Sequence, residues 1–349
     1  MIKYGLIGCG RISYKHVQAF ADNASDSRLI ACVDPIIELA QKQAQNYIDL
    51  MKKNHNIDVE VKVYSSYEDM FSEINEEIDA ISIATESGYH YQHVMDSLKQ
   101  NKHVVVEKPM ALSISHCDEM IELARENNLK LAVSHQNRFN PPIQALRKAI
   151  EQGRFGKLFA GNARILWTRD ENYYKQAPWR GTYAMDGGCL MNQCIHNIDL
   201  LQWMLCGNVE KINSMISNYN HDYIEAEDYG SIQIKFDNNT IGNVEGTVAV
   251  YPKNLEETLT ILGEKGTVVI GGLAVNEIET WDFEDGLDNL EQIKQQTKSD
   301  IDNVYGNGHS SLFEDFNNSI INNTKPLIDG VEGKKSVEII LNVYKQNGR

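Results

Sequence analysis

Two oppositely charged side chains follow a run of valines, in a position that suits a reactive group. The segment 104–109 reads Val-Val-Val-Glu-Lys-Pro. Adjacent β-branched residues without polar alternation predict a strand covered on both faces, as in a parallel sheet. Because ligands bind outside the carboxyl ends of such strands, Glu107 and Lys108 are expected at the mouth of a site. The competing interpretation is a solvated strand end with a chance ion pair.

Lys108 is the first candidate for proton chemistry. An ammonium group held away from water and beside another positive charge has a lowered pKa, which suits it to proton transfer. Proline reduces the free-energy cost of a cis peptide to roughly 0.5–1 kcal/mol. We therefore predict a cis bond between Lys108 and Pro109, which would turn the lysine inward.

His196 is the second candidate, in the segment Asn-Gln-Cys-Ile-His-Asn-Ile-Asp at 192–199. The ordinary pKa of an imidazole suits proton transfer near neutral pH. On a helix, residues four apart share a face, so Asn192 and His196 are expected to point the same way. A histidine ahead of an apolar helix is also typical of a protein core. We favour His196 as the base and Lys108 as the polarising group, and the sequence leaves that choice open.

A glycine-rich turn near the N-terminus predicts a nucleotide site. Residues 8–13 read Gly-Cys-Gly-Arg-Ile-Ser between a predicted strand and a predicted helix. Gly8 and Gly10 permit a tight turn and close approach to a pyrophosphate, which the N–H groups at the helix N-terminus stabilise. Asp34 ends the next predicted strand and is placed to bind a ribose diol. A carboxylate there repels a 2′-phosphate, so NAD is favoured over NADP.

The first third of the chain alternates predicted strands and helices. Strands are expected around 3–10, 28–34, 61–66, 79–85, 103–109 and 129–136, with helical stretches between them. This alternation predicts right-handed βαβ units in a parallel sheet, as in a Rossmann domain. We place this domain at residues 1–131.

The remaining residues, 132–349, show a different pattern. Longer alternating runs are separated by the turns Asp-Asn-Asn-Thr and Gly-Glu-Lys-Gly, which indicate hairpins. This half is expected to be an α+β domain with a large, mainly antiparallel, open-faced sheet, so that the whole chain is α/β in class. Residues 283–303 are polar and weakly periodic and are expected to form a surface excursion, and two helices are expected to close the chain.

Composition excludes several classes of partner. The 349 residues carry a formal net charge of −16, which argues against nucleic acid or an anionic membrane because a phosphate backbone needs a basic face. No run approaches the roughly 18 apolar residues of a membrane span, and the N-terminus shows no secretory leader. None of the six cysteines forms a Cys-x-x-Cys motif, so free thiols, no metal site and a cytoplasmic location are expected.

Four segments, taken together, resemble the Gfo/Idh/MocA oxidoreductases. They are the glycine turn, Thr-Glu-Ser-Gly-Tyr-His at 85–90, Glu-Lys-Pro at 107–109 and the segment 192–199, and they occur in the family's order. Within that family the second half resembles the WlbA-type UDP-N-acetyl-2-amino-2-deoxyglucuronate dehydrogenases, through stretches such as 136–141, 167–174, 179–193, 251–268, 271–278 and 304–309. The resemblance implies NAD contacts from Gly8, Gly10, Arg11, Ile12, Asp34, Thr85, Ser87, His90, Glu107, Lys108 and Gln136.

The arginines point to an anionic substrate. Six of the ten lie between residues 138 and 180. A planar guanidinium grips a carboxylate or phosphate with two hydrogen bonds, so Arg138, Arg169 and Arg180 are candidates for the diphosphate or the uronate. Ordinary surface arginines are the alternative for each of them. Aromatic side chains that could stack against the uracil or the sugar are Tyr173, Tyr174, Trp179 and Tyr251, although buried aromatics usually belong to a core.

The resemblance implies NAD-dependent oxidation of the 3-hydroxyl of a UDP-linked aminosugar uronate, in surface-polysaccharide aminosugar biosynthesis. Lys108, Asn192 and His196 would then face the sugar beside the arginines. Two alternatives stay open. The first is a dehydrogenase of a neutral sugar, a polyol or UDP-N-acetylglucosamine. The second is a non-catalytic dinucleotide-sensing regulator, which the presence of both Lys108 and His196 disfavours. A homo-oligomer, dimer or tetramer, is expected on the uncovered sheet face.

Overall fold

The computed structural model describes residues 1–298 and 306–349, and these form two compact units. The first consists of Met1–Ser134 together with His309–Lys334, and the second of His135–Gly308 together with Lys335–Arg349. The sequence predicts a single boundary near residue 131. The structure divides the chain three residues later and returns 309–334 to the first unit.

The first unit contains a parallel sheet in the order β3-β2-β1-β4-β5-β6. Its strands are β1 (Ile2–Ile7), β2 (Ser27–Val33), β3 (Lys62–Tyr64), β4 (Ala80–Ile83), β5 (His103–Val106) and β6 (Leu131–Val133). The chain order reverses between β1 and β4, which is the point where Rossmann sheets open onto a ligand crevice. The three valines 104–106 are fully buried in β5, which confirms the predicted central strand.

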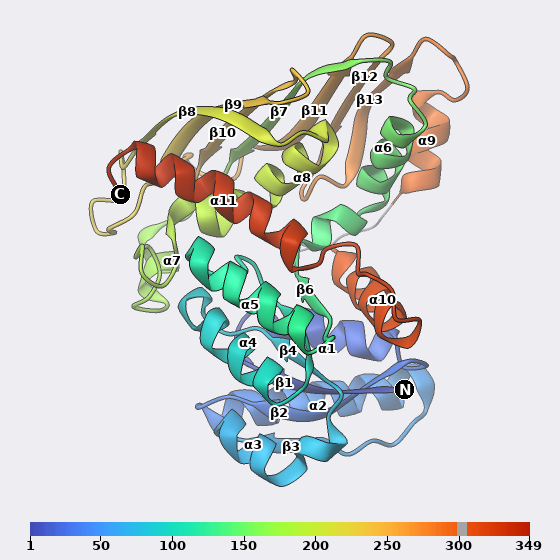
Figure 1. Ribbon diagram of the computed structural model, residues 1–349, viewed down its shortest axis with the longest axis vertical. Helices are drawn as coiled ribbons and strands as arrows, with labels where there is room; N and C mark the ends of the chain where they lie inside the picture. The colour runs from blue at the N-terminus through green and yellow to red at the C-terminus, as the bar shows by residue number, and fades with distance from the viewer. Residues whose placement is uncertain (299–305) are drawn as a thin grey trace. The chain divides into compact units, whose positions relative to one another are not determined.

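Helices cover this sheet on both faces (Figure 1). They are α1 (Ser13–Asp22), α2 (Ile37–His55), α3 (Tyr67–Ile74), α4 (His90–Lys99) and α5 (Ile114–Glu126), with short 3₁₀ turns at η1 (Asn75–Glu77) and η2 (Ser87–Tyr89). The helix α1 packs with α2, and α4 packs with α5. Right-handed crossovers place these two pairs on opposite faces, so the strand ends are free to carry ligands.

The helix α10 (Gly308–Ile321) completes the first unit although it lies far along the chain. Phe313 packs edge-on against Tyr4 and Phe20, with ring centroids 5.8 and 4.9 Å away. The Tyr4 hydroxyl donates to Asn317 at 2.6 Å. A phenol buried in β1 needs such a partner, and α10 supplies it. No local sequence pattern indicates that α10 packs on β1 and α1. For this reason we predicted from the sequence that residues 309–334 belong to the second domain.

The second unit contains a sheet in the order β13-β12-β11-β7-β10-β9-β8. Its strands are β7 (Leu158–Leu166), β8 (Val209–Ser217), β9 (Tyr229–Phe236), β10 (Ile241–Thr247), β11 (Glu256–Gly263), β12 (Gly266–Gly271) and β13 (Glu277–Phe283). Neighbours run antiparallel except β7 and β10, which are parallel. The predicted mainly antiparallel sheet is thus confirmed.

Helices of the second unit include α6 (Pro141–Glu151), α7 (Glu171–Lys175), α8 (Ile195–Leu205), α9 (Leu290–Thr297) and α11 (Gly330–Gln346), which starts in the first unit. In Figure 1, α6, α8 and α11 lie on one side of this sheet. Arg164 on β7 pairs with Glu245 and Glu256 on the two neighbouring strands, at 3.0 and 2.8 Å. All three side chains are partly or largely exposed, so this face of the sheet is polar. The dimer or tetramer expected on it stays a prediction, which light scattering can test.

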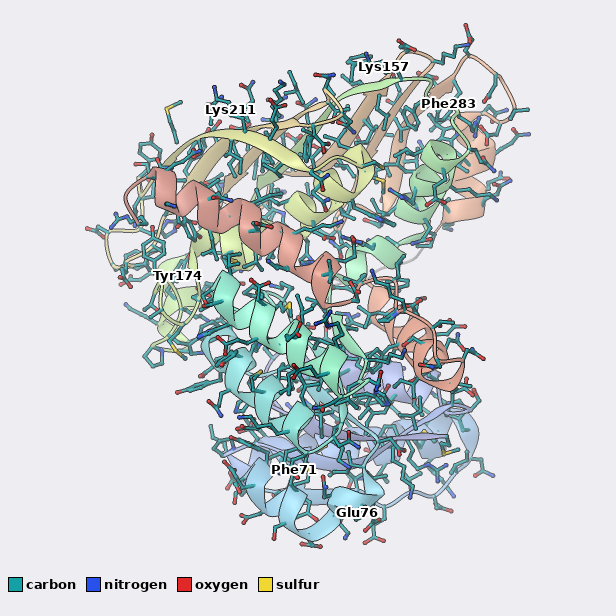
Figure 2. The ribbon with its side chains drawn as sticks, viewed as in Figure 1. Phe71, Glu76, Lys157, Tyr174, Lys211 and Phe283 are labelled. Carbon is teal, nitrogen blue, oxygen red and sulfur yellow. The ribbon has the colours of Figure 1, made fainter. Side chains whose placement is uncertain are left out.

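The predicted polar excursion at 283–303 is partly helical. An Asn289–Gln292 capping box starts α9, and Arg154 bridges Asp285 and Asp288 at 2.9 and 2.7 Å. Phe283, labelled in Figure 2, closes this corner against Phe155, with ring centroids 4.9 Å apart. Residues 299–303 of the excursion, and Val304 and Tyr305 of the family-like stretch 304–309, lie outside the described residues.

The helices and the cysteines give two further observations. Among the described residues, no helix is both long enough and apolar enough to cross a bilayer. All six cysteines are free thiols, and Cys206 alone is exposed.

Candidate functional site

The glycine turn is shaped to exclude side chains from one side and admit a ligand on the other. Gly8 has φ +89°, and a Cβ there would lie 2.7 Å from the backbone of Ala84 and Thr85. At Gly10 a Cβ would meet no atom of the described residues within 4 Å. Ile12, at the N-cap of α1, has no side-chain oxygen to cap the helix. Arg11 is exposed beside this N-terminus, and the turn therefore fits an anionic group such as a dinucleotide pyrophosphate.

Asp34 lies beside the turn and is more constrained than its sequence position predicts. One carboxylate oxygen accepts the Cys9 N–H at 2.8 Å, and the other accepts the Ile36 N–H at 2.9 Å. Asp34 therefore ties the end of β2 to the glycine turn. A carboxylate has about four acceptor positions, so these two bonds leave room for a ribose hydroxyl. The predicted NAD contact of Asp34 fits this geometry and stays a prediction.

The segment after β4 contacts the Glu-Lys-Pro turn through His90. His90 is buried, with Nδ1 2.7 Å from the Pro109 carbonyl oxygen and Nε2 3.1 Å from that of Thr85. Burial lowers the pKa of His90, although the two carbonyls oppose the shift. The His90 ring thus joins two backbone segments, and its predicted contact with the cofactor stays a prediction. Thr85 is partly exposed, with its hydroxyl 3.0 Å from His93 Nδ1, and Ser87 is buried at the start of η2.

The Glu-Lys-Pro turn itself follows β5. The Lys108–Pro109 peptide is cis, which confirms the prediction, and Lys108 is half-buried. Glu107 is only 5% exposed, and its carboxylate is engaged by the rings of His16 and His309 and by the Lys108 N–H. Both of its oxygens thus serve the protein, and its predicted contact with the cofactor stays a prediction.

In the second unit, the segment that leads to His196 forms an unexpected π-helical turn, η4 (Leu190–Cys194), before α8 begins. The Asn192 amide donates to Asp186, and its oxygen accepts from Gln193 at 3.0 Å. His196 stands in the first turn of α8, edge-on to His135 with ring centroids 5.7 Å apart. Single π-helical turns such as η4 occur frequently at functional sites, so η4 is consistent with the predicted roles of Asn192 and His196.

Arg169 and Arg180 come together around one tyrosine. Their guanidinium carbons lie 5.3 and 4.4 Å from the centre of the Tyr173 ring. Arg169 donates to Gln193 at 2.8 Å, and Arg180 donates to the Tyr173 hydroxyl at 2.6 Å. Tyr174, labelled in Figure 2, packs edge-on against Tyr173. The structure thus gathers two predicted cations beside Asn192 and Gln193.

Arg138 does not join this cluster, and its burial argues against the predicted contact with the substrate. Its side chain is fully buried and donates to both carboxylate oxygens of Asp199, at 2.8 and 2.7 Å. The guanidinium also stacks over Trp203 at 4.8 Å. Burial acts to raise the pKa of Asp199, but Arg138 and His135 outweigh it and lower that pKa. Arg138 is a structural cation that neutralises a buried carboxylate.

Two other predicted residues stand apart. Tyr251 is 92% exposed, so within this chain its ring belongs to no enclosed site. Gln136 lies in the short 3₁₀ turn η3 (Gln136–Phe139) of the second unit, whereas the other predicted NAD ligands belong to the first unit. Gln136 is buried, and its side-chain oxygen has no hydrogen-bond partner among the described residues.

The sequence analysis missed several polar groups that organise the second unit. His221 is 2.7 Å from the Asp228 carboxylate and 2.7 Å from the Arg169 carbonyl oxygen, so it holds the backbone of that arginine. Burial lowers the pKa of His221, but the hydrogen bonds to Asp228 and to the Arg169 carbonyl raise it overall. His221 and Asp228 are seven residues apart in a loop-rich region, and no motif in the sequence marks them.

Two buried glutamates were also missed. Glu227 accepts the Leu190 N–H at 2.8 Å, where η4 begins, and the Tyr344 hydroxyl at 2.9 Å, and burial raises its pKa to about 7. Glu257 on β11 is 4% exposed, and burial raises its pKa to about 8 despite the Asn197 amide and the Arg169 charge. An alternating strand pattern with a glutamate at an inward position was the available signal for Glu257.

The βαβ order, the side-chain-free glycine turn and the acidic end of β2 define the first unit as a dinucleotide-binding domain of the dehydrogenase class. The chain belongs to the GFO/IDH/MocA oxidoreductase family. Residues 2–135 match the family's NAD-binding Rossmann-fold model, and residues 143–269 match the model of its C-terminal domain. The protein is therefore an NAD-dependent oxidoreductase, as the sequence indicated.

Solved structures resemble the whole chain. The WlbA dehydrogenase from Bordetella pertussis, in complex with NADH and UDP-GlcNAcA, is 35% identical with a TM-score of 0.87, over 100% of this chain and 96% of that one. The Chromobacterium violaceum WlbA complex with the same two ligands is 32% identical with a TM-score of 0.84, over 100% and 94%. Among curated relatives, scyllo-inositol 2-dehydrogenase (NAD(+)) from Bacillus subtilis is 23% identical over 78% of this chain and 74% of its own.

Replacing Asp34 tests its two roles at once. We expect Asp34→Ala to weaken NAD binding by about 1.5–3 kcal/mol, because charged hydrogen bonds to ribose hydroxyls are lost. The ligand-free protein should also lose about 1–3 kcal/mol of unfolding free energy, because the Cys9 and Ile36 amides lose their acceptor. Calorimetry and denaturant unfolding measure the two effects, with Asp34→Asn as the shape-matched control. Unchanged NAD affinity in Asp34→Ala would remove Asp34 from the cofactor site.

Glu257 should make stability depend on pH. Its folded pKa of about 8 exceeds the ordinary value of 4.5, so the folded state binds the proton more tightly than the unfolded state does. Stability is then lost progressively as pH rises from about 4.5 to 8. We expect Glu257→Gln to exceed the parent in unfolding free energy by about 3 kcal/mol at pH 7, and by little at pH 5. Denaturant unfolding across this range measures the difference, and a constant difference would contradict a protonated Glu257.

Proposed function

We propose that this protein oxidises the 3-hydroxyl of a UDP-linked N-acetylaminosugar uronate to the 3-keto sugar. The observation that carries the proposal is the similarity along the whole chain to two dehydrogenases solved with NADH and UDP-GlcNAcA. The Arg169 and Arg180 cluster supports an anionic substrate, because guanidinium groups bind carboxylate and diphosphate oxygens with two hydrogen bonds. We place the reaction, as part of the same proposal, in aminosugar biosynthesis for surface polysaccharides.

The chemistry needs one proton acceptor from the chain. Bound NAD⁺ supplies the hydride acceptor, while the hydroxyl proton must pass to a side chain. We propose that His196 takes this proton and that Lys108 polarises the oxygen as it becomes a carbonyl. Lys108 follows closely after β5, and His196 stands in the first turn of α8, directly after the π turn.

A substrate panel tests the function. We expect NADH absorbance to rise with UDP-GlcNAcA, more slowly with UDP-GlcNAc, and negligibly with myo-inositol. Lys108→Ala and His196→Ala should each lower kcat by about 10²-fold or more, because a positioned proton-transfer or polarising group is lost, with NAD affinity nearly unchanged.

Turnover of inositol alone would favour the polyol alternative. NAD binding without oxidation of any sugar would favour the dinucleotide-sensing regulator. Parental turnover in His196→Ala, with the best substrate, would end the assignment of His196 as the base.

We also propose that the neutral amide of Asn192 suits an anionic sugar. A carboxylate at this position would repel a uronate in a site of low dielectric, whereas an amide can donate to it. We expect Asn192→Asp to lower kcat/KM for UDP-GlcNAcA about 10-fold more than for UDP-GlcNAc, a difference of about 1.4 kcal/mol. The two substrates differ only in the carboxylate, and steady-state rates at fixed NAD measure the ratio.

The control addresses Asp186, which accepts from the Asn192 amide. Asn192→Asp also sets two carboxylates against each other, whatever the substrate. The exchange variant Asp186→Asn with Asn192→Asp removes that repulsion. If the exchange variant has the same ratio of kcat/KM for the two substrates as the parent, Asn192 acts as a hydrogen-bond partner of Asp186 and does not distinguish substrates by charge.

A further inference from the structure

We propose that His309 is a positioning residue for the reaction: together with His16 it holds the Glu107 carboxylate, which in turn fixes the backbone at Lys108. The inference rests on the proposed role of Lys108 in catalysis. It concerns residues of the first unit alone, and two of them, His16 and His309, were not among the residues that the sequence singled out.

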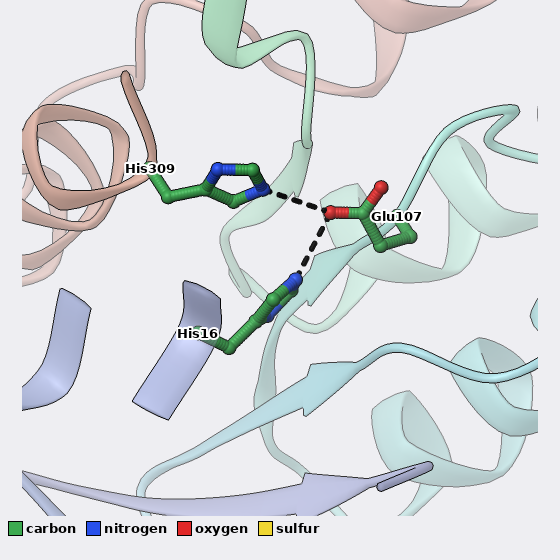
Figure 3. A group of neighbouring side chains, drawn as sticks. All are labelled: His16, Glu107 and His309. Atoms are coloured by element: carbon green, nitrogen blue, oxygen red, sulfur yellow. Dashed lines mark hydrogen bonds and ion pairs between the residues drawn. The ribbon is translucent and has the colours of Figure 1, made fainter. Parts of the chain in front are cut away.

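The geometry gives Glu107 a donor on each side (Figure 3). Its Oε1 lies 2.9 Å from His16 Nε2 and 3.3 Å from His309 Nε2. Its Oε2 accepts the N–H of Lys108 at 3.3 Å. A carboxylate held at both oxygens cannot rotate freely, so the peptide that joins Glu107 to Lys108 is held in one orientation. The Lys108 side chain leaves the backbone from that peptide.

The histidine rings have their own supports. His16 Nδ1 is 2.7 Å from the Ser82 hydroxyl, which can donate to it and so leave the proton on Nε2 for Glu107. His309 packs against His16, with ring centroids 5.4 Å apart. Phe313, one turn further along α10, packs edge-on against His16 at 5.4 Å. The histidines are thus fixed by α1, β4 and α10 together.

The docking of α10 delivers His309 to this place. Asn23 at the end of α1 donates to the Ser310 carbonyl at 2.9 Å, next to His309 in the chain. The Tyr4 hydroxyl anchors the helix about two turns further on, at Asn317. These contacts explain physically why a segment some 200 residues from Glu107 returns to the first unit. Without α10, Glu107 would lose one of its two imidazole donors.

Electrostatics favours an ionised Glu107. Burial acts to raise its pKa, but hydrogen bonds from His16 and His309 hold the pKa well below the usual range. Burial lowers the pKa of His309, despite the opposing Glu107 hydrogen bond, so this ring is neutral near pH 7 and donates through Nε2. A fixed negative charge one residue before Lys108 also suits the ammonium form of that lysine.

A metal ion is the competing explanation, because the ligand atoms of His16, Glu107 and His309 all lie within 4.8 Å of one another. The 2.9 Å separation of His16 Nε2 and Glu107 Oε1 is that of a hydrogen bond. Two ligands on a tetrahedral zinc, with bonds of about 2.0–2.1 Å, would stand about 3.3 Å apart. The separation of His309 Nε2 and Glu107 Oε1 is 3.3 Å, which a shared metal would also give, so metal analysis decides between the two explanations.

The first experiment compares His309→Leu with His309→Gln, whose amide can replace the Nε2 donor. We expect His309→Leu to lower kcat by about 10-fold or more, because misplaced catalytic groups are costly, with KM for UDP-GlcNAcA changed less. His309→Gln should recover most of the rate. His55→Leu, which alters an exposed histidine of the same unit, is the control. Equal rates in His309→Leu and the parent would overturn the proposal.

A double-mutant cycle separates positioning from general damage. If His309 acts through Lys108, His309→Leu should cause little further loss in kcat when Lys108 is already alanine. Losses that multiply would overturn the proposal, because they indicate an independent effect. Failure of the proposed function itself would give a different result. Lys108→Ala would then keep the parental rate, or no variant would oxidise any sugar.

A third measurement needs no turnover. Hydrogen exchange of the Lys108 amide, followed by NMR in the ligand-free protein, should be about 10-fold faster or more in His309→Leu and near the parental rate in His309→Gln. Calorimetry should give NAD affinities within about threefold of the parent for both variants. Unchanged exchange in His309→Leu would overturn the proposal. One equivalent of a first-row divalent metal in the purified parent, lost in His309→Gln, would overturn it as well.

Discussion

A carboxylate removed from water must meet donors on its oxygens, and each unit of this protein contains such a group held by several elements. In the first unit it is Glu107, which receives two imidazoles and a backbone amide. In the second unit it is Asp199, which receives both arms of Arg138. Removing a partner from either would leave an uncompensated buried charge, so the elements that supply the donors are held in place.

This constraint links chemistry to architecture. Glu107 precedes Lys108, and Asp199 lies three residues after His196 on α8. The charged networks therefore adjoin both residues proposed for catalysis. The second network also explains why arginines of similar sequence context differ in role. Arg138 forms a two-bond ion pair with a buried carboxylate. Arg169 and Arg180 instead donate to the neutral side chains of Gln193 and Tyr173, which leaves their charge for a ligand.

Much of the nucleotide half was predictable because its signals are local. A tight glycine turn, a buried valine strand and a proline that permits a cis bond each depend on a few adjacent residues, and Gly8, residues 104–106 and Lys108–Pro109 behave as expected. The same local view gave no sign of the contacts that Glu107 and His90 make within the protein. A motif marks residues that matter near a cofactor without distinguishing those that touch it from those that support the backbone around it.

The sequence by itself determined the order of strands and helices, the dinucleotide class of the first unit, the mainly antiparallel sheet of the second and the family. Hydrophobic periodicity and turn chemistry act over short stretches, so a linear reading captures them. Only the tertiary structure decided that α10 belongs to the first unit, that His309 reaches Glu107 and that Arg138 is buried against Asp199. These outcomes depend on the burial of groups far apart in the chain, and the cost of an unpaired buried charge has no signature in local sequence.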